Sequence, residues 1–157
     1  MKKRLRIGTY NIAHAAFAEG GAEEIGAFLA AQDLDVVGLQ EIDVGTRRVK
    51  GADVLKKTAN GGAYPYFFFA KAMDYQDGGY GIGMLSRYPI LEVETISLYA
   101  GEEEPRVLCR VTIHVNGERL TVWNTHTSYE DREIRTRQLE QIAACVSACD
   151  EFVLMGD

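Results

Sequence analysis

Residues 34–41 read LDVVGLQE, an apolar run that ends on a glutamine and a glutamate. A short apolar run of this kind predicts a strand that is buried on both faces. We expect the strand to end at Glu41, where a loop would release its carboxylate from the sheet. The residues on either side indicate what kind of sheet this is.

The preceding residues predict a strand followed by a helix. In residues 4–12, RLRIGTYNI, apolar and polar side chains alternate, as in a half-buried strand, and Asn11 lies near its end. Two early glutamates in 21–32 favour a helix N-terminus. This helix pattern has apolar side chains at helical spacing: Ile25, Phe28 and Leu29.

More strands and two helices are expected downstream. Residues 44–62 predict a loop with a short helix, and residues 74–80 predict a turn-rich loop. Asn116-Gly117 predicts a tight hairpin turn. Strand patterns fall at 64–71, 81–87, 88–98, 106–115, 119–127 and 151–156. This order predicts an α/β protein with a mixed sheet, or two sheets, and helices outside.

The last predicted helix covers residues 128–149. Ser128 is the expected N-cap, because serine side chains commonly accept hydrogen bonds from the first turn of a helix. The apolar side chains expected to face the core are Ile134, Leu139, Ile142, Ala143 and Val146.

Length and charge narrow the class of protein. A chain of 157 residues without repeats or linkers predicts one domain, 1–157. The net charge of −6 argues against a broad basic surface for nucleic acid. No signal-peptide core and no run of about 20 apolar residues is present, so we expect a cytoplasmic protein.

Cysteine usage supports the same location. The three cysteines, an odd number, fit free thiols in a reducing compartment better than a disulfide framework. Cys145 and Cys149 lie four residues apart but have no nearby histidine, which makes a poor zinc site. We therefore interpret them, together with Cys109, as small buried apolar side chains.

Polar residues recur where predicted strands end. Asn11, Glu41 and Asp157 each lie near a strand end, and a fourth strand carries Asn124 and His126. Ligands of α/β folds commonly bind at such ends. Oxygen ligands of this kind suit Mg²⁺ or Mn²⁺, and a histidine with an arginine would hold the remaining charge of a phosphate. Each residue taken alone is more often structural, but together they predict a site for phosphoester hydrolysis.

Five segments carry a family resemblance. In order, they are GTYNI (8–12), DVVGLQEID (35–43), GYGIGMLSRYPI (79–90), VWNTH (122–126) and VLMGD (153–157). They resemble the successive motifs of the endonuclease/exonuclease/phosphatase superfamily. The resemblance implies a DNase I-like α/β sandwich, in which helices flank two mixed or antiparallel sheets. It also implies a phosphoesterase that depends on Mg²⁺ or Mn²⁺.

The resemblance assigns roles to five residues. Glu41 resembles the principal metal-binding carboxylate, and Asn11 the residue that supports the metal or its water. His126 resembles the histidine that contacts the scissile phosphate, and Asp157 the aspartate that positions or deprotonates the attacking water. Arg106 is a looser match to an arginine that points at the phosphate.

Other motif residues are given structural interpretations. We interpret Ser86 and Arg87 as turn and strand-end residues, and the aromatic side chains of Tyr64, Tyr66 and 67–69 as core, although a rim aromatic would stack a base or sugar.

A small basic loop follows Glu41 and contains Arg47, Arg48 and Lys50. It would guide an anionic substrate, but we favour a solvated loop. His14 is interpreted as a loop residue with a minor possible role at the substrate.

The resemblance also implies that residues 1–157 contain only part of the superfamily pattern. The superfamily pattern continues beyond the aspartate with an Asn two residues later and a final Asp-His pair, so residues 1–157 resemble an N-terminal portion with an incomplete second sheet. We expect little or no hydrolysis by this chain alone, and self-association through exposed sheet surface.

Two functions stay open at this point. One is a phosphodiesterase or phosphatase whose activity resides in the full-length protein, and the other is a non-catalytic remnant that binds a metal, a phosphate ligand or a protein. We favour the enzyme. The acidic chain favours a small phosphoester, a sugar or inositol phosphate, or a lipid headgroup over duplex DNA.

Overall fold

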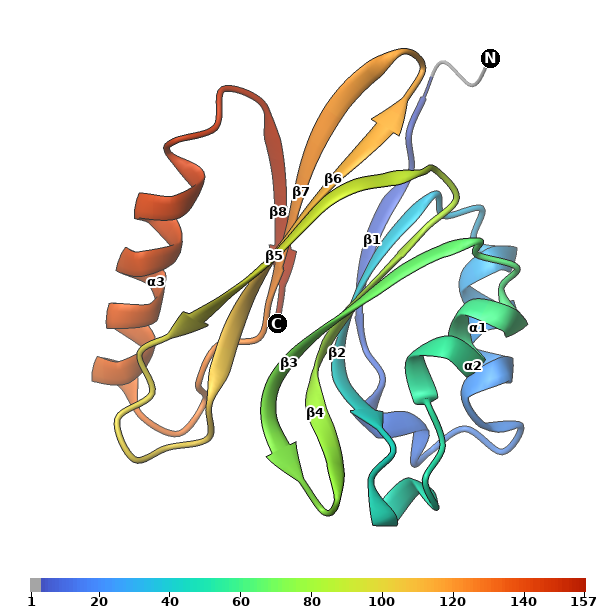
Figure 1. Cartoon of the computed structure of the whole chain (residues 1–157), viewed down its shortest axis with the longest axis horizontal. Coiled ribbons are helices and arrows are strands. Elements are labelled where there is room, and N and C mark those ends of the chain that lie inside the picture. The colour runs from blue at the N-terminus through green and yellow to red at the C-terminus, as the bar shows by residue number, and fades with distance from the viewer. Residues whose placement is uncertain (1–3) are drawn as a thin grey trace.

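In the computed structural model, which describes residues 4–157, two four-stranded sheets pack face to face between layers of helices (Figure 1). The first sheet has the order β1 (Ile7–Asn11), β2 (Val36–Val44), β4 (Gly78–Ser86) and β3 (Tyr66–Tyr75). The second has the order β5 (Ile90–Leu98), β6 (Arg106–Val115), β7 (Glu118–Thr125) and β8 (Phe152–Gly156).

Helices flank the sandwich on both sides. Helices α1 (Gly21–Ala31) and α2 (Val54–Gly61) cover the first sheet, and α3 (Arg132–Val146) covers the second (Figure 1). Strand β1 runs parallel to β2, and β7 runs parallel to β8, whereas the other neighbours are antiparallel. The predicted sandwich of two mixed sheets with helices outside is thus confirmed.

None of the helices in the described part of the chain has the length and apolar character needed to cross a membrane.

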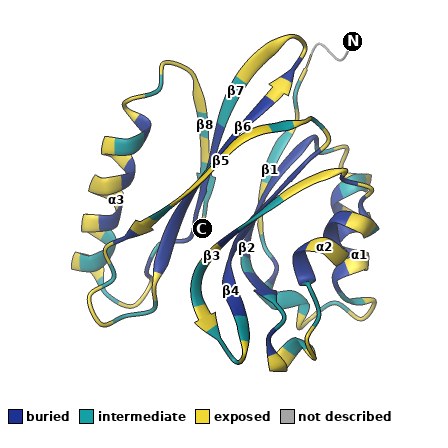
Figure 2. Cartoon of the chain, viewed as in Figure 1, coloured by how far each residue is buried: buried dark blue, intermediate teal, exposed yellow. Residues whose placement is uncertain are grey.

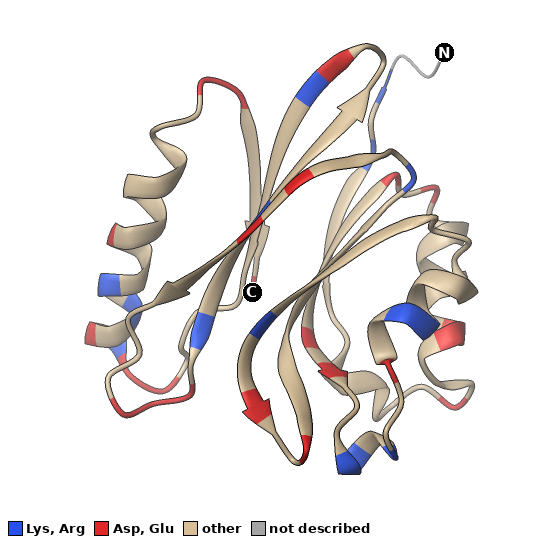
Figure 3. Cartoon of the chain, in the orientation of Figure 1, with Lys and Arg blue, Asp and Glu red and all other residues tan. Residues whose placement is uncertain are grey.

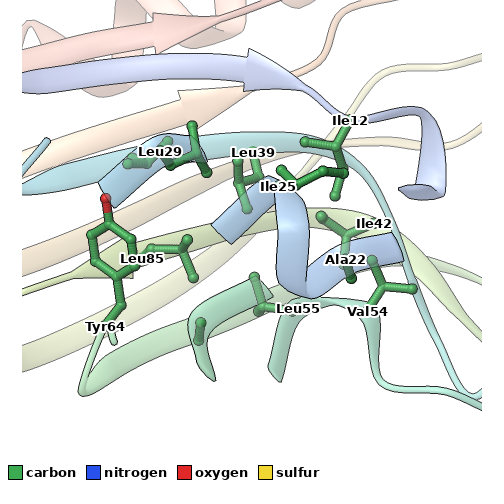
Figure 4. Close-up of a cluster of buried hydrophobic side chains, with 12 residues drawn as sticks. Ile12, Ala22, Ile25, Leu29, Leu39, Ile42, Val54, Leu55, Tyr64 and Leu85 are labelled. Carbon is green, nitrogen blue, oxygen red and sulfur yellow. The ribbon is translucent and has the colours of Figure 1, made fainter. Parts of the chain in front are cut away.

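Strand β2 lies at the centre of the packing, as its sequence predicts. Leu39 points into the core under α1 and α2 (Figure 4), and Val37 belongs to the same cluster. Val36 belongs instead to the core between the sheets. The strand is buried on both faces because helices cover one and the second sheet covers the other (Figure 2). Each such side chain contributes roughly 1.5–3 kcal/mol to folding.

The backbones of helices α1 and α2 contact each other at glycine residues. A Cβ atom on Gly26 would lie 2.0 Å from the backbone oxygen of Thr58, and one on Gly61 would lie 2.1 Å from the oxygen of Glu23. Neither position has room for a side chain. The absence of Cβ atoms at these two residues therefore allows the two helix backbones to touch.

Two strands are longer than their sequences predict. Strand β2 does not end at Glu41 but continues to Val44, because a bulge absorbs the irregular residues and pairing with β4 then resumes. Strand β3 extends to Tyr75, and the predicted loop at 74–80 shrinks to a two-residue turn. Gln76 and Asp77 form this turn with φ values of 46° and 68°, the left-handed geometry of tight hairpins.

The predictions for α3 are partly wrong. Asp131, not Ser128, caps this helix, and its carboxylate accepts a hydrogen bond of 2.9 Å from the Ile134 amide. Leu139 is 53% exposed, and Ala143 is also exposed.

The face of α3 toward the sheet carries Gln138, Ile142 and Val146, at intervals of four residues. Gln138 is buried because its amide satisfies two backbone groups, the Ser128 N–H at 2.8 Å and the Tyr99 carbonyl at 2.9 Å. A polar residue thus occupies a core position that the apolar pattern assigns to its neighbours.

The aromatic segment is also less buried than expected. Tyr64 is buried, whereas Tyr66 and Phe67 are each 39% exposed. The reason is that β3 is an edge strand of its sheet. Ser86 and Arg87 take the structural roles expected of them, since the Ser86 hydroxyl donates to the Tyr88 carbonyl and Arg87 donates to the Leu34 carbonyl.

Candidate active site

Glu41 sits at the bulge of β2. Pairing with β4 shifts register between Leu39 and Ile42, and Glu41 has a φ of 57°, in the left-handed region that non-glycine residues seldom adopt. Such conformations cost of order 1–3 kcal/mol and collect at functional sites. The bulge turns the Glu41 side chain out of the regular alternation of the strand.

The side-chain amide of Asn11 donates hydrogen bonds to two carboxylates. Its Nδ2 donates to Oε1 of Glu41 at 2.9 Å and to Oδ2 of Asp157 at 2.8 Å. Its Oδ1 accepts a hydrogen bond of 3.0 Å from the Ala13 amide, which fixes the orientation of the side chain. Parallel pairing of β1 with β2 places Asn11 beside Gln40, next to Glu41. Residues far apart in the sequence thus converge on one amide group.

Asp157 reaches this position from β8. Its backbone N–H donates to the Thr125 carbonyl, and its own carbonyl accepts from the Thr127 N–H. These bonds continue the parallel pairing of β7 with β8 past the strand end. They bring Oδ2 of Asp157 to 3.7 Å from Nε2 of His126.

His126 and Arg106 form a buried pair. Nη1 of Arg106 lies 2.8 Å from Nδ1 of His126. Arginine has no acceptor, so Nδ1 accepts the hydrogen bond and Nε2 carries the proton, directed toward Asp157. Burial lowers the pKa of His126, and the Arg106 charge lowers it further, so the imidazole is neutral at pH 7.

Arg106 has a carboxylate partner. It is 4% exposed, and its Nη2 lies 3.2 Å from Oε1 of Glu104. The five predicted site residues therefore form one chain of neighbours, in the order Glu41, Asn11, Asp157, His126, Arg106.

Asn124 is not part of this chain, although its position near a strand end made it a candidate. It is fully buried between the sheets, and its Nδ2 donates to the carbonyls of Leu39 and Gly83. Its Oδ1 accepts a hydrogen bond of 2.7 Å from Gln40. Asn124 cross-links the two sheets beneath the site.

A cavity of about 240 Å³ opens beside His126. Its lining includes Glu41, Arg106 and Arg48. Arg48 is exposed, as the solvated-loop interpretation of 47–50 predicts, but Asp43 holds its guanidinium with two hydrogen bonds of 2.6 and 2.7 Å, which that interpretation did not include. Asp43 lies in the strand extension beyond Glu41, so the sequence pattern, which ends the strand at Glu41, missed it.

The side chain of His14 lies near the same charged residues. Burial lowers its pKa, as does the charge of Arg48, whereas Asp43 and Glu41 oppose the shift. His14 does not line the 240 Å³ cavity. It contributes to the charge balance around Glu41 from the loop after β1.

The donor set fits a hard divalent cation. No three His, Cys, Asp or Glu side chains within residues 4–157 cluster closely enough to form a metal site alone. Glu41 and Asp157, however, are two carboxylates that share one amide donor. Mg²⁺ is commonly held by one or two carboxylates, with waters and substrate phosphate as its other ligands. Glu41 would thus hold the ion, Asp157 would orient a water beside it, and Asn11 would hold both carboxylates in place.

The fold and site define a DNase I-like α/β sandwich with polar residues gathered at strand ends. The chain belongs to the Endonuclease/Exonuclease/phosphatase family, whose model matches residues 8–157. Among curated proteins, none matches the sequence significantly.

Solved structures share the fold. An endonuclease/exonuclease/phosphatase from Bacteroides vulgatus has a TM-score of 0.76 at 18% identity, and the match covers 99% of this chain and 66% of that one. Sphingomyelinase C from Streptomyces griseocarneus has a TM-score of 0.72 at 24% identity, with 98% and 63% covered. The mannosyl-6-phosphatase of Bacteroides thetaiotaomicron has a TM-score of 0.72 at 16% identity, with 98% and 65% covered. The chain thus spans about two thirds of these structures.

Proposed function

We propose that the complete protein carrying this chain hydrolyses phosphoesters with the help of Mg²⁺ or Mn²⁺. The observation that supports this most is the double hydrogen bond from Asn11 to Glu41 and Asp157. Two carboxylates are held together at 2.8–2.9 Å from one amide, an arrangement that a bound cation would stabilise. Membership of the family supports the same reaction class.

Each residue has a task in this proposal. The metal ion, when bound, would neutralise phosphate charge and polarise the P–O bond. Glu41 would hold the ion, and Asp157 would orient the attacking water and accept its proton. His126, protonated on Nε2, donates a hydrogen bond to a phosphate oxygen. Arg106 keeps His126 in that tautomer and adds positive charge behind it.

The proposed substrate is a small phosphoester or a lipid headgroup, not duplex DNA. The cavity of about 240 Å³ is smaller than the roughly 300–1,000 Å³ of most ligand pockets. Lysine and arginine residues are interspersed with acidic ones along the ribbon (Figure 3). The net charge of −6 also disfavours a broad contact with duplex DNA. Two structural neighbours are a sphingomyelinase and a sugar phosphatase, which supports small phosphoesters as candidates.

Hydrolysis by the complete gene product tests the proposal. The substrates are phosphodiesters, phosphomonoesters, phospholipid headgroups and DNA, each with Mg²⁺ or Mn²⁺. We expect metal-dependent turnover that Glu41→Gln removes and that Glu118→Gln, a change of an exposed carboxylate, retains. For the 157-residue chain alone we expect little or no turnover, since it spans about two thirds of its solved neighbours. Turnover that persists in Glu41→Gln would overturn the assignment.

Surface and cysteine chemistry support two further proposals. Phe152 and Leu154 on the edge strand β8 are 40% and 42% exposed, which supports self-association of the chain. Sedimentation at several concentrations tests this self-association.

The three cysteines are free, which supports a cytoplasmic location. Cell fractionation tests this location.

A further inference from the structure

Arg48 is held rigidly in the wall of the cavity. Its Nε and Nη2 donate to the carboxylate of Asp43, which is fully buried and also accepts a hydrogen bond of 2.5 Å from Thr46. The backbone N–H of Arg48 donates to the side-chain carbonyl of Gln76 at 2.9 Å. The Asp43 carboxylate is buried while the Arg48 side chain is 30% exposed, and desolvation of the carboxylate offsets the attraction, so the pair is weak evidence for stability. This pair instead fixes the direction of a guanidinium that lines the cavity.

Aromatic rings complete this wall. The guanidinium carbon of Arg48 lies 4.8 Å from the centre of the Tyr75 ring and 5.5 Å from that of Tyr80. Both tyrosines and Met73 line the same cavity. The third guanidinium nitrogen, Nη1, makes no hydrogen bond within the described residues, so it is available to an oxygen acceptor.

The positively charged side chains that line the cavity are already paired with carboxylates. Asp43 neutralises the charge of Arg48 and occupies its Nε–Nη2 edge, one of the two edges through which a guanidinium binds an anion in a bidentate manner. Glu104 pairs with Arg106 at 3.2 Å. The remaining charged residue of the lining, Glu41, is negative and belongs to the proposed metal site. A second phosphate on the substrate would find no unpaired cation here.

Polar atoms in the wall suit hydroxyl groups. Oε1 of Glu104 is buried beside Nη2 of Arg106, but the side chain as a whole is 33% exposed, which leaves Oε2 to accept a hydrogen bond from a ligand. The Tyr75 hydroxyl accepts from Gln76 at 3.2 Å and keeps its own proton for donation. Single donors and acceptors beside aromatic faces match the hydroxyl groups and C–H faces of a polyol.

We propose that the cavity wall contains a subsite for the leaving group of the substrate, formed by Arg48, Tyr75, Tyr80 and Glu104. The leaving group is a polyol, and the substrate carries a single phosphate, as a sugar monophosphate does. The inference rests on the proposed function, which places the reacting phosphate between Glu41 and His126. Arg48 and Glu104 are specificity residues in this account, because they contact the polyol and not the reacting phosphorus.

Methionine methyl NMR of the complete gene product tests the subsite without turnover. Met73 lines the cavity and reports on its occupancy, whereas Met84 is fully buried elsewhere and is the internal control. The probes are ethyl phosphate, glucose 6-phosphate and glucose 1,6-bisphosphate, each titrated with and without Mg²⁺. We expect glucose 6-phosphate to shift Met73 with roughly tenfold higher affinity than ethyl phosphate, as two or three added hydrogen bonds would give.

Variants separate the subsite from the phosphate site. Arg48→Met should abolish most of the preference for glucose 6-phosphate over ethyl phosphate, and Glu104→Gln should reduce it. Arg47→Met, one residue away, should keep the preference, because Arg47 is exposed and pairs with Asp77.

Three results would overturn the subsite: equal affinities for glucose 6-phosphate and ethyl phosphate, a bisphosphate that binds tenfold more tightly than the monophosphate, or no shift of Met73. Metal-dependent hydrolysis of any phosphoester in the activity assay would leave the proposed function standing in each case. If the complete gene product hydrolyses no phosphoester but still prefers glucose 6-phosphate to ethyl phosphate in binding, the proposed function is wrong and the subsite stands.

Discussion

Arg106 donates a hydrogen bond of 2.8 Å to Nδ1 of His126 in the buried wall of the site. The contact can form because His126 is neutral, since a protonated imidazole would present a second donor to the guanidinium. It fixes the tautomer that directs Nε2–H toward Asp157. Protonation of His126 therefore disturbs both the fold and the proposed phosphate contact.

Acid should destabilise the protein through His126. Burial, followed by the Arg106 charge, lowers its pKa below the ordinary 6.5, and the pKa of His14 is lowered as well. The unfolded chain then binds protons first, so the stabilisation is complete above pH 6.5 and is lost as the pH falls through the folded-state pKa. Urea unfolding between pH 8 and about pH 5 should show this fall.

His126→Gln isolates the contribution of this histidine. The free energy of unfolding of the variant should depend less on pH over the same range. His114→Gln is the matched control, because that side chain is exposed on β6, and it should retain the parent's dependence. A His126→Gln variant with the full parental loss of stability in acid would contradict the account.

Asn124 should be essential to the sandwich. Asn124→Ala leaves the carbonyls of Leu39 and Gly83 without their partner and opens a void between the sheets. We expect a loss of about 3 kcal/mol in the free energy of unfolding. Asn60→Ala on the exposed face of α2 should change it by less than about 0.5 kcal/mol. Equal effects of the two substitutions, measured in urea, would exclude the cross-linking role.

Gly26→Ala should reverse the usual sign of a helix substitution. Alanine in place of glycine normally stabilises a helix by up to about 1 kcal/mol. At Gly26 the new Cβ would meet the Thr58 carbonyl at 2.0 Å, so α1 and α2 must separate. We expect a loss of about 2 kcal/mol or more. A rise in melting temperature would show that the helices are not in backbone contact.

The sequence predicts the elements, and the convergence of Asn11, Glu41 and Asp157, better than it predicts their surroundings. Apolar runs and polar strand ends are local patterns, so β2 and the positions of Asn11, Glu41 and Asp157 are accessible from them. The bulge at Glu41 is set by pairing with β4, which a local pattern does not contain. Strand pairing is a property of two distant segments.

Polar side chains that pair with distant residues explain most of the remaining errors. Gln138 and Asn124 look like surface residues by type, yet each is buried because it satisfies backbone groups of another element. Arg48 looks like part of a solvated basic loop until Asp43 is placed in the extended β2. In each case the partner, not the residue type, determines where the side chain is held.

Glu41 is the residue that we propose to anchor a divalent metal. Electron paramagnetic resonance of Mn²⁺ measures free ion directly, so titration of the complete gene product gives the affinity without any substrate. We predict that Glu41→Gln weakens Mn²⁺ binding by at least about tenfold, while Glu118→Gln leaves it at the parental value. Parental Mn²⁺ affinity in Glu41→Gln would contradict the account.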